Sequence, residues 1–148
     1  SIMITSCIKN EGKTFTAFNL STFLASKGKK VVLYFYPKDM TPGCIAESCD
    51  LRDNYIRLQA AGYEVLGVSA DSVKAHLNFV TKKELPFDLL ADTERETIEA
   101  FGVWQLKKFM GKEYMGIVRT TFIIDEKGVI EEIIEKVKTK EHTAQILK

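Results

Sequence analysis

One short apolar run constrains the fold more than any other part of the chain. Residues 31–36 are six consecutive β-branched, aromatic or aliphatic residues, and Pro37 follows them directly. A continuous run of this length and composition is typical of a strand that is buried on both faces of a sheet. Proline cannot donate to a strand ladder, so the strand is expected to end there.

The segment after this strand predicts a helix that begins close to a cysteine. Thr41 suits the N-cap position, Pro42 suits a first helical turn, and residues 43–61 have a helix-compatible composition. Cys44 then lies in the first turn, where the helix dipole and free backbone N–H groups favour a thiolate. We therefore interpret Cys44 as a nucleophile; the alternative is a buried structural cysteine.

Cys49 follows Cys44 after five residues. On a continuous helix this spacing separates the two Cα atoms by about 8.6 Å, beyond the roughly 7 Å that a disulfide can span. A Cys44–Cys49 disulfide therefore requires the first helical turns to unwind. The spacing also differs from the C-x-x-C of simple dithiol exchange proteins.

Length and charge limit the remaining possibilities. The 148 residues, 45% hydrophobic and 28% charged, predict a single domain spanning 1–148. A net charge of +1 gives no reason to expect nucleic acid or a membrane surface as a partner. The chain shows no long apolar segment and no leader pattern, and its close cysteine pair is more typical of a reducing compartment, so we expect a cytoplasmic protein.

Along the chain, hydrophobic periodicity alternates between strand and helix patterns. This predicts an α/β fold whose mixed β-sheet is flanked by helices. The expected strands are 3–8 and 14–18 as an N-terminal β-hairpin, 31–36, 63–69, 87–90, 117–124 and 129–134; the expected helices are 20–26, 43–61, 73–84 with Val73, Leu77 and Val80 inward, 94–101 and 140–148.

Several separate motifs resemble one family. Pro37, Thr41 and Cys44 match the peroxiredoxin pattern P-x-x-x-T-x-x-C, and Cys49 matches the resolving cysteine of its bacterioferritin-comigratory, or peroxiredoxin Q, subgroup (atypical 2-Cys). Residues 102–125 resemble a second region of that family, in which Arg119 matches the active-site arginine. The resemblance covers about residues 28–148 and implies a thioredoxin-like fold. The family's usual Gly, Asp and Pro lead-in is absent from this chain.

The resemblance also implies a mechanism. Cys44 would reduce hydrogen peroxide or an organic hydroperoxide and become a sulfenic acid, with Thr41 and Arg119 orienting the O–O bond and Pro37 shielding the product. Cys49 would resolve the sulfenic acid as an intramolecular disulfide, which a thioredoxin-like dithiol reduces. No metal or organic cofactor is implied. A monomer suffices for this cycle, although a dimer is possible.

Two other functions fit the residues. A general thiol-disulfide oxidoreductase on the same fold would not need an arginine beside the sulfur, and a non-catalytic interaction module would not need a reactive Cys44. His76 and His142 lack the neighbours in sequence that a metal site requires, so we expect solvated or capping roles for them. Trp104, Phe109 and Tyr114 are expected to pack. Cys7 is expected to take no part in the chemistry; the alternative is an adventitious bond.

Overall fold

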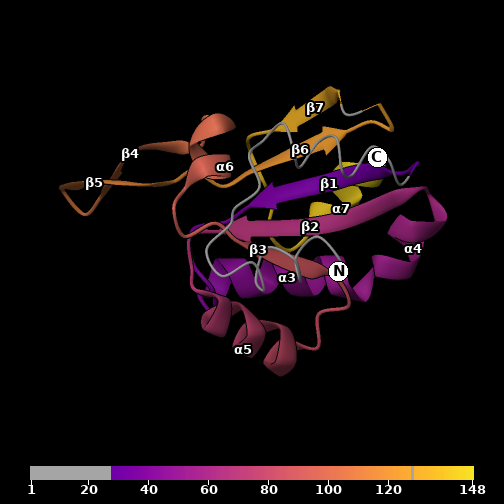
Figure 1. Ribbon diagram of the computed structural model, residues 1–148, viewed down its shortest axis with the longest axis horizontal. Helices are drawn as coiled ribbons and strands as arrows, with labels where there is room; N and C mark the ends of the chain where they lie inside the picture. Colours follow the sequence, from indigo (N-terminus) through magenta and orange to yellow (C-terminus); the bar gives the residue numbers. More distant parts are fainter. Residues whose placement is uncertain (1–27, 128) are drawn as a thin grey trace.

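A computed structural model describes residues 28–127 and 129–148 of the chain. The described residues form one central sheet, five flanking helices and a separate two-stranded hairpin (Figure 1). The elements are β1 (Lys30–Phe35), α3 (Pro42–Asp53), α4 (Tyr55–Ala60), β2 (Tyr63–Ser69), α5 (Val73–Lys83), β3 (Asp88–Ala91), α6 (Glu96–Ala100), β4 (Trp104–Phe109), β5 (Lys112–Ile117), β6 (Thr120–Ile124), β7 (Ile130–Ile134) and α7 (His142–Leu147). The predicted N-terminal hairpin and the helical turn at 20–26 lie outside the described residues.

The central sheet has the strand order β3-β2-β1-β6-β7, with β1 in the middle. β1 pairs in parallel with β2, and β2 in parallel with β3, through crossovers that contain helices. On its other side β1 pairs antiparallel with β6, which pairs antiparallel with β7. The mixed sheet flanked by helices that the sequence predicts is therefore confirmed.

Alternate residues of β1 belong to two hydrophobic cores, one on each face of the sheet. Val31, Leu33 and Phe35 pack into the core that includes Ile98 of α6. Val32 and Tyr34 pack into the other core, which α3, α5 and α7 supply with side chains. Every residue from 31 to 36 is buried, as the strand prediction requires, because successive side chains of a strand point to opposite faces.

Two expected elements are interrupted. The helix predicted over 43–61 is divided at Asn54 into α3 and α4; Asn54 adopts φ −114° and ψ 14°, and its side chain donates to the Asp50 carbonyl. The strand predicted over 117–124 is also wrong as one element, because β5 ends at Ile117 and β6 begins at Thr120. Arg119 lies in the short connection between them rather than in a strand.

The buried face of α5 differs from the expected one. His76 and Phe79 are its buried side chains, whereas Leu77 is 53% exposed. The residues expected to point inward, Val73, Leu77 and Val80, therefore include one that faces solvent. The helix is rotated because His76 has polar partners inside the protein, which an apolar periodicity cannot reveal.

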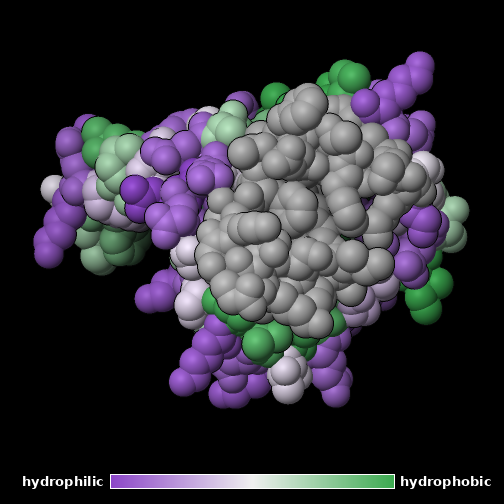
Figure 2. Space-filling view, viewed as in Figure 1, coloured by the Kyte–Doolittle hydropathy of each residue, from purple (hydrophilic) through white to green (hydrophobic). Residues whose placement is uncertain are grey.

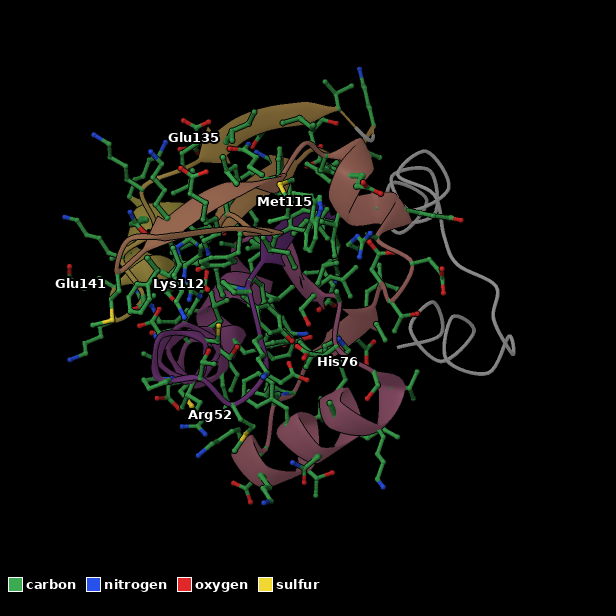
Figure 3. The ribbon with its side chains drawn as sticks, turned by 90° about the vertical axis from the view of Figure 1, so that its left-hand side faces the viewer. Arg52, His76, Lys112, Met115, Glu135 and Glu141 are labelled. Carbon is green, nitrogen blue, oxygen red and sulfur yellow. The ribbon has the colours of Figure 1, made fainter. Side chains whose placement is uncertain are left out.

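The β4–β5 hairpin projects away from the central sheet (Figure 1). In the space-filling view the hairpin presents a mixture of hydrophilic and hydrophobic side chains (Figure 2), and in the side-chain view Lys112 and Met115 lie on β5 whereas His76 belongs to α5 (Figure 3). The exposed apolar side chains of the hairpin are Leu106, Phe109, Met110, Tyr114 and Met115. The packing roles predicted for Phe109 and Tyr114 are therefore wrong, since Phe109 is 64% exposed and Tyr114 46% exposed.

Gly67 in β2 allows a close contact that supports α3. A Cβ at this position would lie 2.7 Å from Leu89 Cδ2 and 2.7 Å from Tyr34 Cζ. The Tyr34 hydroxyl in turn shares a 2.9 Å hydrogen bond with Ser48 Oγ on α3. Glycine is therefore required where the ring of Tyr34 crosses the neighbouring strand.

Gly67→Ala is expected to lower the free energy of unfolding by about 1–3 kcal/mol, because the methyl group overpacks a rigid contact. Gly116→Ala in β5 is the matched control, because its nearest neighbour is the flexible Lys107 side chain, at 3.2 Å. Urea unfolding of both variants checks this. Equal effects of the two substitutions would contradict the argument.

Candidate active site

Cys44 lies in the first turn of α3, as predicted, with Pro42 at the first helical position. Its side chain is fully buried. The buried residues of α3 are Cys44, Glu47, Ser48 and Leu51, a spacing of three, four and seven that defines one helical face. This face rests on the sheet, so the sheet fixes the orientation of the Cys44 side chain.

Thr41 occupies the predicted N-cap position but does not use its hydroxyl to cap the helix. Its backbone is extended, with φ −86° and ψ 152°, and its carbonyl accepts from the Ile45 N–H at 2.8 Å. The Thr41 hydroxyl instead donates to the Lys38 carbonyl at 2.9 Å. Because the hydroxyl uses its proton for this bond, its oxygen can still accept a hydrogen bond from another group.

Arg119 reaches Cys44 from the other half of the sheet. Thr120 pairs with Phe35, so the antiparallel register of β6 and β1 puts Arg119 next to the end of β1, where the Pro37 turn begins. Arg119 Nη2 donates to Cys44 Sγ at 3.3 Å. Arg119 therefore lies beside the sulfur, as the sequence predicts. The strand order brings these two residues together although they are 75 positions apart in the chain.

Gly43 leaves room for this approach. A Cβ on Gly43 would lie 3.1 Å from Arg119 Nη2, the nitrogen that contacts the sulfur. Such a distance is tighter than ordinary van der Waals contact, so a side chain there would displace the guanidinium. The absence of a side chain at Gly43 therefore leaves the space that Arg119 occupies beside the sulfur.

Glu47 is part of the site, although the sequence analysis did not identify it. Its carboxylate is completely buried and accepts from Arg119 Nη1 at 2.6 Å through Oε1. Burial raises the pKa of Glu47 to about 7, and the opposing charge of Arg119 only partly offsets this. Burial opposes the charged form of Arg119, but Glu47 and Cys44 outweigh it and raise the pKa of the guanidinium. Glu47 follows Cys44 by three residues, a spacing that puts both side chains on one face of a helix. This spacing was the sequence signal that could have identified Glu47.

Cys49 lies on the same helix as Cys44 but not on the same face. It is half-buried, and both thiols are free. Because α3 is continuous from Pro42 to Asp53, the helical geometry that keeps these thiols apart is present. A disulfide between them would require α3 to open at its N-terminal end.

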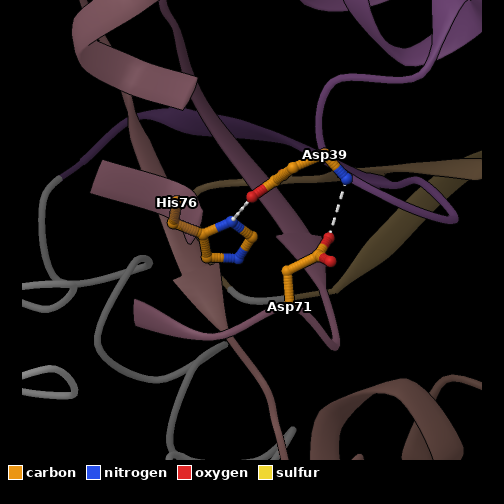
Figure 4. A group of neighbouring side chains, drawn as sticks. All are labelled: Asp39, Asp71 and His76. Carbon is orange, nitrogen blue, oxygen red and sulfur yellow. Dashed lines mark hydrogen bonds and ion pairs between the residues drawn. The ribbon is translucent and has the colours of Figure 1, made fainter. Parts of the chain in front are cut away.

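A second polar cluster fixes the turn that holds Thr41. Asp39 Oδ2 lies 2.6 Å from His76 Nδ1, and the Asp39 N–H donates to Asp71 Oδ2 at 2.8 Å (Figure 4). His76 Nε2 lies 3.1 Å from the Leu90 carbonyl. His76 is buried, so the solvated or capping role predicted for it is wrong.

The three residues Asp39, Asp71 and His76 bring ligand-type atoms within 4.8 Å of one another. However, both nitrogens of His76 face oxygen acceptors of the protein. Asp71 Oδ2 also accepts from the Ser69 hydroxyl at 2.7 Å. These atoms already have protein partners, so the cluster is a structural hydrogen-bond network. It anchors the turn between β1 and α3, residues 37–41 (the motif turn), to β2 and α5.

A pocket of about 360 Å³ opens beside Pro37, between the motif turn and the β4–β5 hairpin. Trp104, Tyr114 and Met115 are among the residues that line it, together with Lys107, whose amine donates to the Ile117 carbonyl at 2.9 Å. Burial and the charge of Arg119 lower the pKa of Lys107, while Cys44 opposes them. The pocket could accommodate the apolar part of a small molecule next to the site.

Comparison with known proteins identifies the family of this chain. Residues 6–133 match the AhpC/TSA family. The chain is 53% identical over 121 residues to peroxiredoxin Bcp of Bacillus subtilis, covering 82% of this chain and 77% of the relative, and 46% identical over 129 residues to peroxiredoxin Bcp of Escherichia coli, covering 87% and 81%.

Solved structures give the same result. A cysteine-to-serine mutant of peroxiredoxin Q from Xanthomonas campestris superposes with a TM-score of 0.76 at 40% identity, covering 81% of this chain and 76% of that one. A trapped intermediate and ligand complex of the X. campestris bacterioferritin comigratory protein, described in terms of alkyl peroxide reduction, matches at 39% identity with the same TM-score and coverage. The thioredoxin-like fold is therefore confirmed. The chain belongs to the AhpC/TSA family, in its Bcp and peroxiredoxin Q group, and is a thiol-dependent peroxidase that reduces a hydroperoxide at the expense of a thiol reductant.

Proposed function

We propose that Cys44 is the peroxidatic cysteine and Cys49 the resolving one. The observation that carries this proposal is the 3.3 Å contact between Arg119 Nη2 and Cys44 Sγ at the start of α3. A guanidinium and a helix N-terminus beside a sulfur atom both favour its anionic form, which is the nucleophile. Cys49 lacks such a hydrogen bond among the described residues.

In the first step the Cys44 thiolate attacks the terminal oxygen of the hydroperoxide. The O–O bond breaks, the sulfur becomes a sulfenic acid, and the leaving alkoxide or hydroxide takes up a proton. Arg119 and Thr41 orient the two peroxide oxygens, and the N–H groups of Gly43 and Cys44 add donors at the helix N-terminus. Pro37 limits the access of water to the sulfenic acid.

In the second step α3 opens at its N-terminal end and the Cys49 sulfur attacks the sulfenic sulfur of Cys44. A disulfide forms and water leaves. A thioredoxin-like dithiol then reduces the disulfide by exchange and restores both thiols. The cycle uses residues of one chain, so we propose a monomer as the active unit, with no metal or organic cofactor.

The pocket beside Pro37 supports a substrate range that includes organic hydroperoxides as well as hydrogen peroxide. Its apolar lining would cover an alkyl group while the peroxide end faces the motif turn. We further propose a cytoplasmic location, where a thiol reductant keeps the pair reduced. No described helix is long and apolar enough to cross a membrane. Partners beyond hydroperoxide and reductant, such as nucleic acid or a membrane, are not part of this proposal.

Single-turnover kinetics separate the two cysteines. Reduced Cys44→Ser is expected to consume no hydrogen peroxide, whereas Cys49→Ser consumes one equivalent per chain and stops, because only Cys44 reacts with peroxide. Stopped-flow Trp104 fluorescence followed by thiol counting measures both. Equal loss of the first turnover in the two variants would contradict the assignment, and peroxide-independent reduction of insulin disulfides would favour a general oxidoreductase.

Arg119→Lys is expected to slow the oxidation of Cys44 by roughly ten- to hundredfold, since removing a charged hydrogen bond costs about 1.5–3 kcal/mol. A lysine amine cannot replace the two separate N–H contacts that Arg119 makes with Glu47 and Cys44. Arg52→Lys, at the other end of α3, is the matched control and should react at the wild-type rate. A wild-type rate in Arg119→Lys would remove Arg119 from the mechanism.

A further inference from the structure

A buried carboxylate oxygen beside the site has no hydrogen-bond partner. Glu47 Oε1 accepts from Arg119, but Glu47 Oε2 has no partner among the described residues. His142 of α7 lies on this side of the carboxylate, with its Nε2 3.5 Å from Oε2. Both side chains are completely buried. An unpaired buried oxygen is costly, so the arrangement calls for an explanation.

The other contacts of His142 determine which of its nitrogens carries a proton. Gln145 donates its amide to the Lys136 carbonyl and accepts the Lys138 N–H with Oε1, so its orientation is fixed by backbone groups. His142 Nδ1 lies 2.9 Å from this Oε1, and since an amide oxygen only accepts, Nδ1 carries the proton. The capping or solvated role predicted for His142 is therefore wrong.

When the ring is neutral, His142 Nε2 therefore carries a lone pair. Two oxygens lie next to this nitrogen, one from Thr121 and one from Glu47. Thr121 Oγ1, at 2.7 Å, can donate its hydroxyl proton to Nε2. Glu47 Oε2 offers only a lone pair, so a carboxylate and a neutral ring meet there without a proton between them. One added proton, on either atom, would supply the hydrogen bond that Oε2 lacks.

The surrounding charges allow this proton to be gained and lost near neutral pH. The titratable groups that face the pair are Asp50 of α3, Arg119, Tyr34 of β1 and Cys44. Burial lowers the pKa of His142, Gln145 and Asp50 oppose this, and Arg119 adds to it. Burial raises the pKa of Glu47 to about 7. Because Glu47 Oε2 and His142 Nε2 lie 3.5 Å apart inside the protein, we treat the two groups as one coupled pair.

The position of Arg119 connects this pair to the sulfur. Its guanidinium is shared between Glu47 Oε1, at 2.6 Å, and Cys44 Sγ, at 3.3 Å. When the Glu47–His142 pair holds its proton, the carboxylate draws less of the positive charge of Arg119, and more is available to the sulfur. When the proton leaves, Glu47 competes more strongly with Cys44.

We propose that His142 is a positioning residue of the peroxidase site, which shares one proton with Glu47 and so controls how strongly Arg119 stabilises the reacting Cys44 thiolate. The inference rests on the proposed roles of Cys44 and Arg119. It adds the C-terminal helix α7 to the site: His142 begins that helix, and the N–H of the next residue, Thr143, donates to Asp50 Oδ2 on α3 at 2.7 Å.

The test is the rate of Cys44 oxidation by hydrogen peroxide in stopped flow, measured between about pH 5.5 and pH 8.5. In His142→Gln the amide can donate to Glu47 Oε2 but cannot titrate, and this hydrogen bond to the carboxylate lowers the pKa of Glu47, so more of Glu47 is ionised near pH 6 than in the wild type. The ratio of the wild-type to the variant rate constant is expected to be on the order of three- to tenfold near pH 6 and to approach one at the alkaline end, as coupling between neighbouring groups implies.

Ile146→Val is the matched control, because Ile146 anchors the same helix in the core and carries no group that can titrate. Its rate ratio to wild type should not change with pH. A pH-independent ratio in His142→Gln, of any size, would mean that His142 only packs α7 and would overturn the inference. If wild-type protein showed no Cys44 oxidation, the proposed catalytic roles would fail instead.

Unfolding experiments give a second readout that does not depend on activity. Near pH 5.5 the unfolded wild-type chain binds one proton, on His142. The folded chain also binds one proton, which Glu47 and His142 share. The number of protons bound by these two residues is therefore nearly the same in both states. Glu47→Gln leaves a buried histidine with a lowered pKa, and is expected to lose stability relative to wild type as pH falls below about 6.5.

His142→Leu leaves Glu47 with its raised pKa, and stability should then fall relative to wild type as pH rises from about 4.5 to about 7. The two substitutions therefore have opposite pH slopes. Urea unfolding at several pH values measures them. Slopes of the same sign, or none, would contradict a shared proton.

Discussion

The site depends on one largely buried guanidinium, which lies between a carboxyl group and a cysteine sulfur. Arg119 is 21% exposed, and its two terminal nitrogens contact Glu47 and Cys44 separately. Removal from water makes each contact stronger than it would be at the surface, and it also makes an unpaired charge costly. The geometry of the helix start, the sheet register and the absence of a side chain on Gly43 all serve to hold this one group in place.

One part of the scaffold around this contact is held by hydrogen bonds, and another part must unfold locally before a disulfide can form. The motif turn is tied to β2 and α5 through Asp39, Asp71 and His76, and the inner face of α3 is tied to β1 through Tyr34 and Ser48. The first turns of α3, in contrast, must open before the two cysteines can meet. In the proposed cycle the same helix holds Cys44 for the reaction with peroxide and releases it for disulfide formation.

Two of the buried ionisable groups, Glu47 and His142, lie beside Arg119 and Cys44. Glu47 and His142 are both completely buried, at an energetic cost that ordinary packing would avoid. A carboxylate whose pKa is raised to about 7 next to a histidine whose pKa is lowered can change its proton count under physiological conditions. This arrangement makes α7, the last helix of the chain, a functional part of a site whose cysteine lies in the first described helix.

The sequence by itself determined the central strand, the helix start at Cys44 and the identity of Thr41, Cys49 and Arg119 as candidate site residues, because these depend on local patterns and on motifs. It did not determine the break at Asn54, the division between β5 and β6, or the rotation of α5 that buries His76. It also missed Glu47 and assigned His142 to solvent or a cap. Only the tertiary structure brings these residues together, since buried polar groups are selected by partners from distant segments, and apolar periodicity contains no information about such partners.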